Sequence, residues 1–399
     1  MNNDSRLKSK SITIEEFIFY FALFLYCAYV MLANTVWIYE AEDTILMIRK
    51  VLRYSIFFLI CLDILYINEY TPFRLSIYIV LFGIALLEWK QIDSSGLFLQ
   101  FGLILCAGNI DFKKIVNYLM VLILLWLVFV HGLCFFGVIE DYTYTHTLGS
   151  YSQTAHSLGF KAYNHLGFMA MAISLMFIYV KKPGFLCLLM LLIVNYLYYK
   201  IHTTRLSLLI VFAGAFLYVI SFHLRMIKFS WKGWTKVFTI LPLLMFLMVF
   251  FLVYMYDKGK LKISLSFMST LESRLKYSVY FYKTYGIKIL GQHIEMNTIS
   301  DKHYNGADNN VYLDSGYVYS LIVYGLVLTL IILIMYTLIS RHIIKKGDVV
   351  LIVWFIVMLG AIVVNNFILN LIFNPLLFLF PKAINDFISG SSNGIYEEI

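Results

Sequence analysis

Long apolar runs recur along almost the whole chain, with short polar segments between most of them. A membrane-spanning helix needs about 20 apolar residues, and shorter helices are tolerated inside a bundle. By this rule the pattern predicts about twelve transmembrane helices in an all-α, polytopic membrane protein. The expected spans are 17–38, 52–68, 75–89, 96–109, 115–138, 163–180, 184–200, 205–222, 237–256, 316–338, 349–364 and 367–381. The second and fourth runs are weak, and only Asn365 and Asn366 separate the last two, which also fit a re-entrant pair.

One long polar segment interrupts this pattern between residues 257 and 314. A segment of this length between membrane spans usually has a function of its own. Within it, Ser269 and Glu272 have the spacing of a helix capping box. Apolar or aromatic residues then recur at helical spacing up to Gly286: Leu271, Leu275, Val279 and Tyr282. The pattern predicts an extracytoplasmic loop that carries an amphipathic helix on the membrane surface, with basic side chains on or beside its polar face.

The basic residues set the expected orientation of the spans. Lys and Arg gather before the first and fifth spans and after the sixth, eighth and tenth, which places them on one side. The positive-inside rule makes that side, and with it both termini, cytoplasmic. Arg49, Lys50 and Arg53 conflict with this topology, because they fall outside. The predicted parts are an N-terminal transmembrane bundle, the extracytoplasmic loop, and C-terminal transmembrane helices with a short cytoplasmic tail: 1–256, 257–315 and 316–399.

Composition supports the membrane assignment and narrows the function. The 399 residues are 61% hydrophobic and only 14% charged, which excludes an ordinary soluble protein. The net charge of +8 does not indicate a nucleic-acid partner, because the basic residues lie mainly in short loops. The five cysteines lie in apolar runs without a CxxC pair, and no metal-ligand spacing or nucleotide-binding fingerprint occurs. We therefore expect neither a metal nor a cofactor.

Two arginines on the expected outer face are candidates for binding phosphate. Arg205 begins a span beside His202 and Thr204, and Arg274 lies in the loop helix beside Glu272. A guanidinium group grips phosphate through two parallel hydrogen bonds. A long basic side chain at a span end is also stable without any function, because it can snorkel to water. Both interpretations stay open for these residues.

Further polar residues stand where the chain re-enters the membrane from the outer face. Asn164 and His165 begin the sixth expected span, where a structural role competes with substrate binding. Asp308, Asp314 and Tyr317 lie at the end of the long loop and are expected on the outer surface. A carboxylate at such a position can act as a general base on a sugar hydroxyl. It can equally cap the following helix.

Two general bases are therefore candidates. Asp314 directly precedes a span, and His293 lies earlier in the loop. Histidine is the residue type most often used as a general base near neutral pH. The residues alone leave the choice between them open.

Four segments on the same expected face resemble motifs of the Wzy-type oligosaccharide repeat-unit polymerases, which are related to the O-antigen ligases. The family's entry to a span is similar to HSLGFKAYNHLGF, and its T-x-S-R element is similar to HTTRLSLLI, where Thr204 replaces Ser. Its loop segment resembles SRLKYSVYFYKTYGIKILGQHI, and its D-x-x-Y element resembles LDSGYVYSLIVYGL. Ligases tend to carry His where this chain has Asp314, so the resemblance favours a polymerase.

The resemblance implies metal-independent glycosyl transfer on the outer face of a bacterial plasma membrane. The substrates would be oligosaccharide repeat units linked to undecaprenyl diphosphate, which is released as the units join. Membrane lipids, a flippase and a chain-length regulator would be further partners. Arg205 and Arg274 would stabilise the leaving diphosphate, and Asp314 or His293 would act on the acceptor hydroxyl. The other candidates would contact substrate: Asn164, His165, Asp308, Tyr312 and Tyr317.

Two other functions remain as alternatives. An O-antigen-type ligase would transfer the glycan to a different acceptor, and its loss would leave long chains on the lipid. A flippase for lipid-linked oligosaccharides would move substrate without joining it. Transporters of that kind are often built from two repeated halves, and no internal repeat is visible in this chain.

Overall fold

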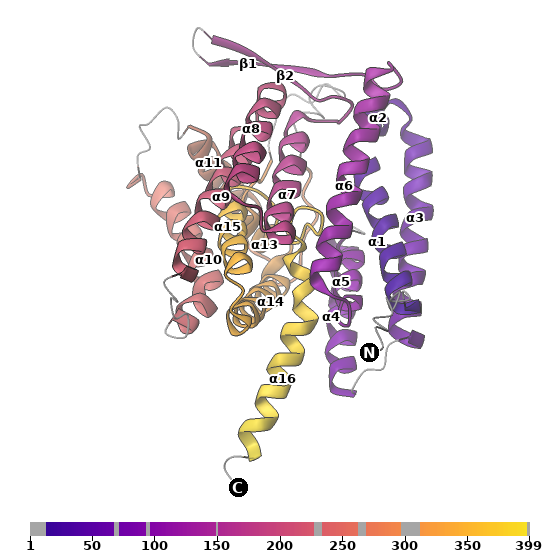
Figure 1. Cartoon of the computed structure of the whole chain (residues 1–399), viewed down its shortest axis with the longest axis vertical. Helices are drawn as coiled ribbons and strands as arrows, with labels where there is room; N and C mark the ends of the chain where they lie inside the picture. The colour runs from indigo at the N-terminus through magenta and orange to yellow at the C-terminus, as the bar shows by residue number, and fades with distance from the viewer. Residues whose placement is uncertain are drawn as a thin grey trace, which may run out of the picture.

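The computed structural model describes residues 13–67, 72–92, 96–148, 151–226, 234–261, 269–296 and 312–396. Most of these residues are helical, and the helices pack into a bundle (Figure 1). Eight described helices are long and apolar enough to cross a membrane: α1 (Ile14–Leu32), α4 (Pro72–Ile92), α6 (Phe112–Phe135), α7 (Tyr163–Lys181), α8 (Phe185–His202), α9 (Arg205–Met226), α10 (Thr235–Asp257) and α14 (Gly325–Lys346). Two shorter apolar helices are α5 (Gly96–Cys106) and α15 (Val349–Val364). The mostly helical class is confirmed and the apolar helices support a membrane protein, whereas the expected number of spans is not confirmed.

The second expected span has different limits. After a short helix α2 (Trp37–Glu40), helix α3 (Glu42–Leu62) starts well before residue 52 and continues as a π-helical turn. This helix carries the basic residues that conflicted with the predicted topology, Arg49, Lys50 and Arg53. Arg49 donates from Nε to the carbonyl of Tyr29 at 3.3 Å, and its guanidinium lies 4.6 Å from the Tyr29 ring centroid. This charge is therefore held against α1 rather than in a loop.

A helix is present where the spacing predicts one in the long polar segment. Helix α11 covers Ser269–Tyr285, and Gly286, at a φ of +65°, follows its end. Leu275 is buried on one side of the helix, and Lys276 is exposed. The capping box falls partly on side chains outside the described residues. Helix α11 packs against α10 and against the short helix α13 (Gly316–Val323).

The span expected over 316–338 is broken into α13 and α14. Gly325 begins α14 with a φ of +75°, a left-handed conformation that favours glycine. A Cβ at this position would lie 2.5 Å from the carbonyl carbon of Leu290. The break therefore requires both the conformational freedom of glycine and the absence of a side chain.

The segment 287–294, called the strap below, crosses this break. Four hydrogen bonds join them: Leu326 N–H to the Lys288 carbonyl (2.9 Å), Val327 N–H to the Ile289 carbonyl (3.1 Å), Gln292 N–H to the Val323 carbonyl (2.9 Å) and Gln292 Nε2 to the Ile322 carbonyl (2.8 Å). Backbone groups near the break are thus paired by the strap. Helix α4 anchors the strap, because Oε2 of buried Glu88 accepts the N–H of Gly291 at 2.8 Å.

The last expected span, 367–381, is wrong as a continuous helix. The chain turns irregularly after Asn365 before a 3₁₀ turn (Pro375–Leu379) and helix α16 (Phe380–Tyr396). Asparagine side chains replace the missing helical bonds. Asn370 Oδ1 accepts the N–H of Ile372 at 3.1 Å, and buried Asn374 donates to the Tyr336 hydroxyl at 2.6 Å. The polar side chains in this apolar stretch thus hold its turn.

A β-hairpin lies across one end of the bundle, so the all-α prediction is wrong at this point (Figure 1). Strands β1 (Thr143–Leu148) and β2 (Tyr151–His156) pair antiparallel. Threonine occupies every second position of β1, and this β-branched residue favours strands. Asp141 ties the base of the hairpin, because its Oδ1 accepts the N–H of Leu158 at 2.7 Å and its Oδ2 lies 2.7 Å from His156 Nδ1.

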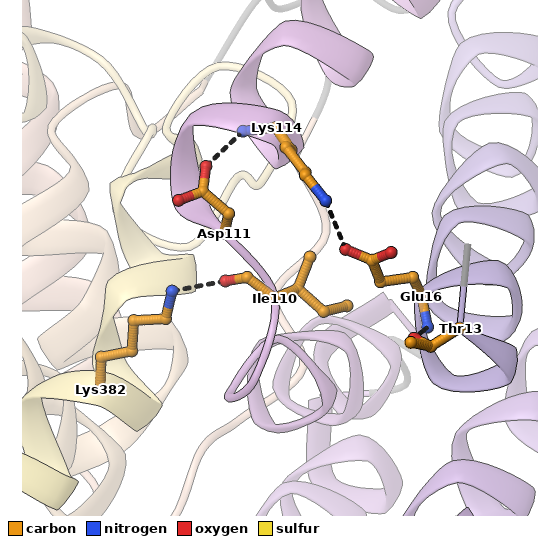
Figure 2. A network of polar contacts seen from close by, with 6 residues as sticks. All are labelled: Thr13, Glu16, Ile110, Asp111, Lys114 and Lys382. Carbon is orange, nitrogen blue, oxygen red and sulfur yellow. Dashed lines mark hydrogen bonds and ion pairs between the residues drawn. The ribbon is translucent and has the colours of Figure 1, made fainter. Parts of the chain in front are cut away.

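Polar contacts join three helices at the opposite end of the bundle (Figure 2). Lys114 of α6 pairs with Glu16 of α1 at 2.7 Å. Asp111 caps α6 by accepting the Lys114 N–H at 3.0 Å. Lys382 of α16 donates to the carbonyl of Ile110. From this junction α16 leads away from the hairpin end (Figure 1).

Candidate functional site

An ion pair links the long polar segment to the bundle. Arg274 of α11 donates from Nε to Oδ2 of Asp314 at 3.3 Å, although the two residues are far apart in sequence. Helix α11 presents Arg274 on the side that faces α13, and Asp314 stands just before the first turn of α13. The arginine side chain is 16% exposed and the aspartate side chain 38% exposed, so the pair lies at a partly open surface.

The surroundings of Asp314 act on its acidity in opposite directions. Burial raises the pKa of this carboxyl group, because the charged form loses hydration. The positive charge of Arg274 and its hydrogen bond lower the same pKa. The net result is a pKa above the ordinary value. A carboxylate of this kind is a stronger base than an exposed aspartate, and its strength depends on where Arg274 lies.

The start of α7 lies against the same carboxylate. Asp314 is close enough to Tyr163, the first residue of α7, to act on its hydroxyl electrostatically. The ring of Tyr144 comes from the hairpin and packs on Tyr163 with 5.3 Å between centroids. The hydroxyl of Tyr144 donates to the carbonyl of Lys161 at 2.7 Å. The hairpin thus reaches the surroundings of the ion pair.

The turn at Asn365 and Asn366 completes this surface. The side chain of Tyr312, two residues before Asp314, forms a hydrogen bond with Asn366. A Cβ on Gly316 would lie 3.1 Å from the carbonyl oxygen of Asn365, so the chain after Asp314 touches this turn. Glycine at 316 permits that approach. The structure therefore brings together α11, the entrance to α13, the start of α7 and the turn after α15.

Four buried polar atoms of these elements have no hydrogen-bond partner among the described residues: Oδ1 of Asn164, Nδ1 of His165, Oγ of Ser315 and Nδ2 of Asn365. Most buried polar atoms in proteins are hydrogen-bonded. Unpaired donors and acceptors gathered around an ion pair can bind a polar ligand.

Arg205 approaches the same end of α7 from another direction. It is the exposed first residue of α9, after a turn in which Thr203 has a φ of +56°. This turn packs tightly on α7, because a Cβ on Gly167 would lie 2.5 Å from Ser207 Oγ and 2.8 Å from Thr204 Cβ. Gly167 stands one helical turn after Asn164. Arg205 therefore begins an element that packs beside the site, and it forms no part of the Arg274–Asp314 ion pair.

His293 is not brought to Asp314. It lies in the strap, and its Nδ1 donates to the carbonyl of Ile92 at 3.0 Å. The neighbouring Gln292 binds Val323, at the opposite end of α13 from Asp314. The helical rise places these two ends about 12 Å apart. The two candidate bases thus occupy different places along α13.

Two other candidates have contrasting outcomes. Tyr317 is 2% exposed, so the expectation that it lies on the surface is wrong. Its ring packs on Phe246, and its hydroxyl donates to the carbonyl of Leu359 at 3.4 Å, because α13 turns this side toward α10 and α15. Asp308 lies outside the described residues.

The sequence did not indicate a role in this site for the side chains of several residues: Tyr144, Tyr163, Ser315, Asn365 and Asn366. The polar turn at Asn365–Asn366 was visible as a feature of the expected outer face. Its place beside Ser315 depends on how α13 and α15 pack, which the spacing of residues along the chain does not encode.

The described residues contain no group of three or more His, Cys, Asp or Glu side chains that is arranged to hold a metal ion. No family model, curated protein or solved structure matches the chain. The site must therefore be interpreted from its own chemistry.

Proposed function

We propose that this protein is a membrane glycosyltransferase of the Wzy type, an oligosaccharide repeat-unit polymerase. It would act on the outer face of a bacterial plasma membrane, with about twelve spans and both termini in the cytoplasm. It would join repeat units carried on undecaprenyl diphosphate and release that lipid diphosphate. The observation that carries the proposal is the Arg274–Asp314 pair at the end of an apolar helical bundle. A cation for a diphosphate and a base for a hydroxyl stand there side by side.

The pair also supplies a physical sequence of events. In the resting protein Arg274 is bonded to Asp314 and lowers its pKa. A bound diphosphate competes for the guanidinium, because it carries more negative charge than one carboxylate. As Arg274 turns to the diphosphate, the pKa of Asp314 rises and the carboxylate becomes a stronger base. Donor binding thus prepares Asp314 to accept the proton of the attacking sugar hydroxyl.

The other candidate residues take their places around this pair. Arg205 adds a second cation for the diphosphate from the start of α9, and Tyr312 lies where a sugar ring would approach Asp314. We assign the base to Asp314, because it adjoins Arg274, whereas His293 stands at the other end of α13. A flippase and a chain-length regulator remain partners of the proposed reaction.

Replacement of Arg274 tests the proposal. Arg274→Ala should reduce polymerisation by about 10²- to 10³-fold, the usual cost of removing one group that stabilises a developing negative charge. Cells would then carry single repeat units in place of long chains, which gel analysis of the glycan resolves. Lys276→Ala is the matched control, because Lys276 is exposed on the same helix.

Two outcomes would contradict the proposal. Wild-type chain lengths in the Arg274→Ala strain would show that Arg274 has no role in polymerisation. Long chains retained on undecaprenyl diphosphate would instead indicate a ligase, since a ligase acts after polymerisation.

A further inference from the structure

Four polar atoms of the site lack a hydrogen-bond partner among the residues that the structure describes, and the steps proposed for Arg274 and Asp314 give them no role. They belong to Asn164, His165, Ser315 and Asn365. Ser315 and Asn365 are each 4% exposed, so water reaches them little. A buried polar group without a partner destabilises the folded state. Several such groups at one place indicate that a ligand supplies the missing partners.

Three of these residues, Asn164, Ser315 and Asn365, lie on elements that pack together. Gly316, next to Ser315, packs on the carbonyl of Asn365. Phe367, two residues after Asn365, packs on Phe168 of α7 with 5.0 Å between ring centroids. Asn164 stands one helical turn before Phe168, so it shares that face of α7. These three residues therefore border the contact between α7, the entrance to α13 and the turn after α15.

The chemistry of these groups is neutral and mixed. The amide nitrogen of Asn365 can only donate, the amide oxygen of Asn164 can only accept, and the Ser315 hydroxyl can do both. A phosphate has only acceptors at these positions and would leave the Asn164 oxygen unpaired. Sugar hydroxyls both donate and accept, so they can pair with every member of the set. Tyr163 precedes Asn164, and its ring packs against Tyr144 of the hairpin.

We propose that Asn164, Ser315 and Asn365 form a neutral subsite that binds the ring hydroxyls of a hexose-class sugar. Ser315 directly follows Asp314, so a sugar held there presents a hydroxyl next to the carboxylate. The subsite therefore binds the acceptor sugar and selects it by its pattern of hydroxyl groups. Its role as acceptor site rests on the proposed function, whereas its capacity to bind a sugar does not.

Sugar binding can be measured without any lipid-linked substrate. The probes are methyl glycosides of glucose, galactose, mannose and N-acetylglucosamine, added at millimolar concentrations to the purified full chain in detergent. Saturation-transfer NMR should show binding of at least one of them. Ser315→Ala and Asn365→Leu should each weaken that binding by at least about tenfold.

Ser320→Ala is the matched control, because Ser320 is fully buried but its hydroxyl already donates to the Tyr317 carbonyl at 2.8 Å. It should leave glycoside binding unchanged. Thermal melting separates the two serines further. Removing the unpaired hydroxyl of Ser315 should raise the melting temperature, whereas a merely structural Ser315 would give a lower one.

Three results would overturn the subsite. These are no binding of any glycoside to the wild type, unchanged binding in both subsite variants, or binding of inorganic pyrophosphate that depends on Ser315 and Asn365. The proposed polymerase can fail separately. If glycoside binding depends on Ser315 but the protein makes no polymer, the result would support the sugar subsite and contradict the polymerase function.

Discussion

Asp314 combines a raised pKa with a direct ion pair, and this combination has a measurable effect on stability. Its folded pKa lies above the unfolded value, because burial outweighs the favourable effect of Arg274. Ionising Asp314 therefore costs folding free energy. The stability that the protonated group contributes is fully present below the unfolded pKa and is lost as the pH rises through the folded pKa.

Asp314→Asn should therefore change stability in a pH-dependent way. At neutral pH the amide carries no charge to desolvate, so we expect the variant to melt at a higher temperature than the wild type. Below about pH 4, where the aspartate is protonated in both states, the two proteins should melt together. Thermal unfolding in detergent between these pH values measures the difference. A variant that melts below the wild type at neutral pH would show that the ion pair outweighs burial.

The individual residues of the site were partly visible in the sequence. Arg274 stood out because a guanidinium group in a predicted surface helix can bind phosphate, and Asp314 stood out because it directly precedes an apolar run. Their pairing was not predicted, because α11 and the entrance to α13 meet only through tertiary packing. Ser315 gave no signal at all, since an isolated serine beside an aspartate is common at helix starts.

The break between α13 and α14 shows how one glycine can fix the shape of a longer element. Gly325 combines a positive φ with the close approach of the Leu290 backbone. Gly347 has a φ of +66° but no atom within 4 Å of its Cβ position. Gly360, inside α15, likewise has no such neighbour, and its φ is not positive. An added Cβ would thus meet both a clash and backbone strain at Gly325, backbone strain alone at Gly347, and neither at Gly360.

Alanine substitutions at these glycines should give graded effects. Gly325→Ala should destabilise the protein by about 2–3 kcal/mol, because the methyl group meets backbone that cannot move without the strap. Gly347→Ala should cost about 1 kcal/mol from left-handed strain alone. Gly360→Ala should stabilise by about 0.5–1 kcal/mol, since alanine favours a helix. Unfolding with a denaturing detergent measures the stability of the three variants. Equal losses of stability in Gly325→Ala and Gly347→Ala would contradict a steric clash at position 325.

Among the elements, those with a regular period were the predictable ones. The helix in the long polar segment follows from the spacing of Leu271, Leu275 and Val279, and α11 is there. The strap and the break were not predicted, because the hydrophobic pattern of α13 continues smoothly into α14. Three of the four hydrogen bonds that join them are between backbone groups, which any residue but proline can supply.

The bundle as a whole has two distinct ends. The hairpin lies at one end, and α16 leads away from the other (Figure 1). Lys114, Glu16 and Lys382 join α1, α6 and α16 near the second end (Figure 2). If the expected orientation holds, the hairpin and the candidate site face the outside, and α16 faces the cytoplasm.

Single-cysteine labelling tests that orientation. In a background without the five native cysteines, Thr154→Cys in the hairpin and Ser389→Cys in α16 each introduce one thiol. A membrane-impermeant maleimide should label position 154 in intact spheroplasts and position 389 only after permeabilisation. Labelling of both positions, or the reverse order, would contradict the topology.

At the level of the fold, hydrophobic runs predicted the membrane class and most of the long helices. The hydrophobic runs did not predict where an apolar stretch of the chain leaves the helical conformation. The runs at 316–338 and 367–381 fit helices in the hydrophobic pattern because apolar residues dominate both. The side-chain amides of Asn370 and Asn374 stabilise the irregular backbone of the second run, and the strap stabilises the break in the first.

The strap also sets a condition on the biogenesis of the protein. A ribosome delivers α13 and α14 after the strap, and at their junction four backbone or side-chain bonds come from residues 288–292. Lipid offers no hydrogen bonds to the carbonyls and N–H groups near residue 324, and each unpaired group costs several kcal/mol. Unpaired backbone groups would therefore make α13 and α14 unstable in the bilayer without the strap. We therefore expect insertion of α14 and docking of the strap against α4 to be coupled, so a shortened strap should produce chains that reach the membrane but fail to assemble.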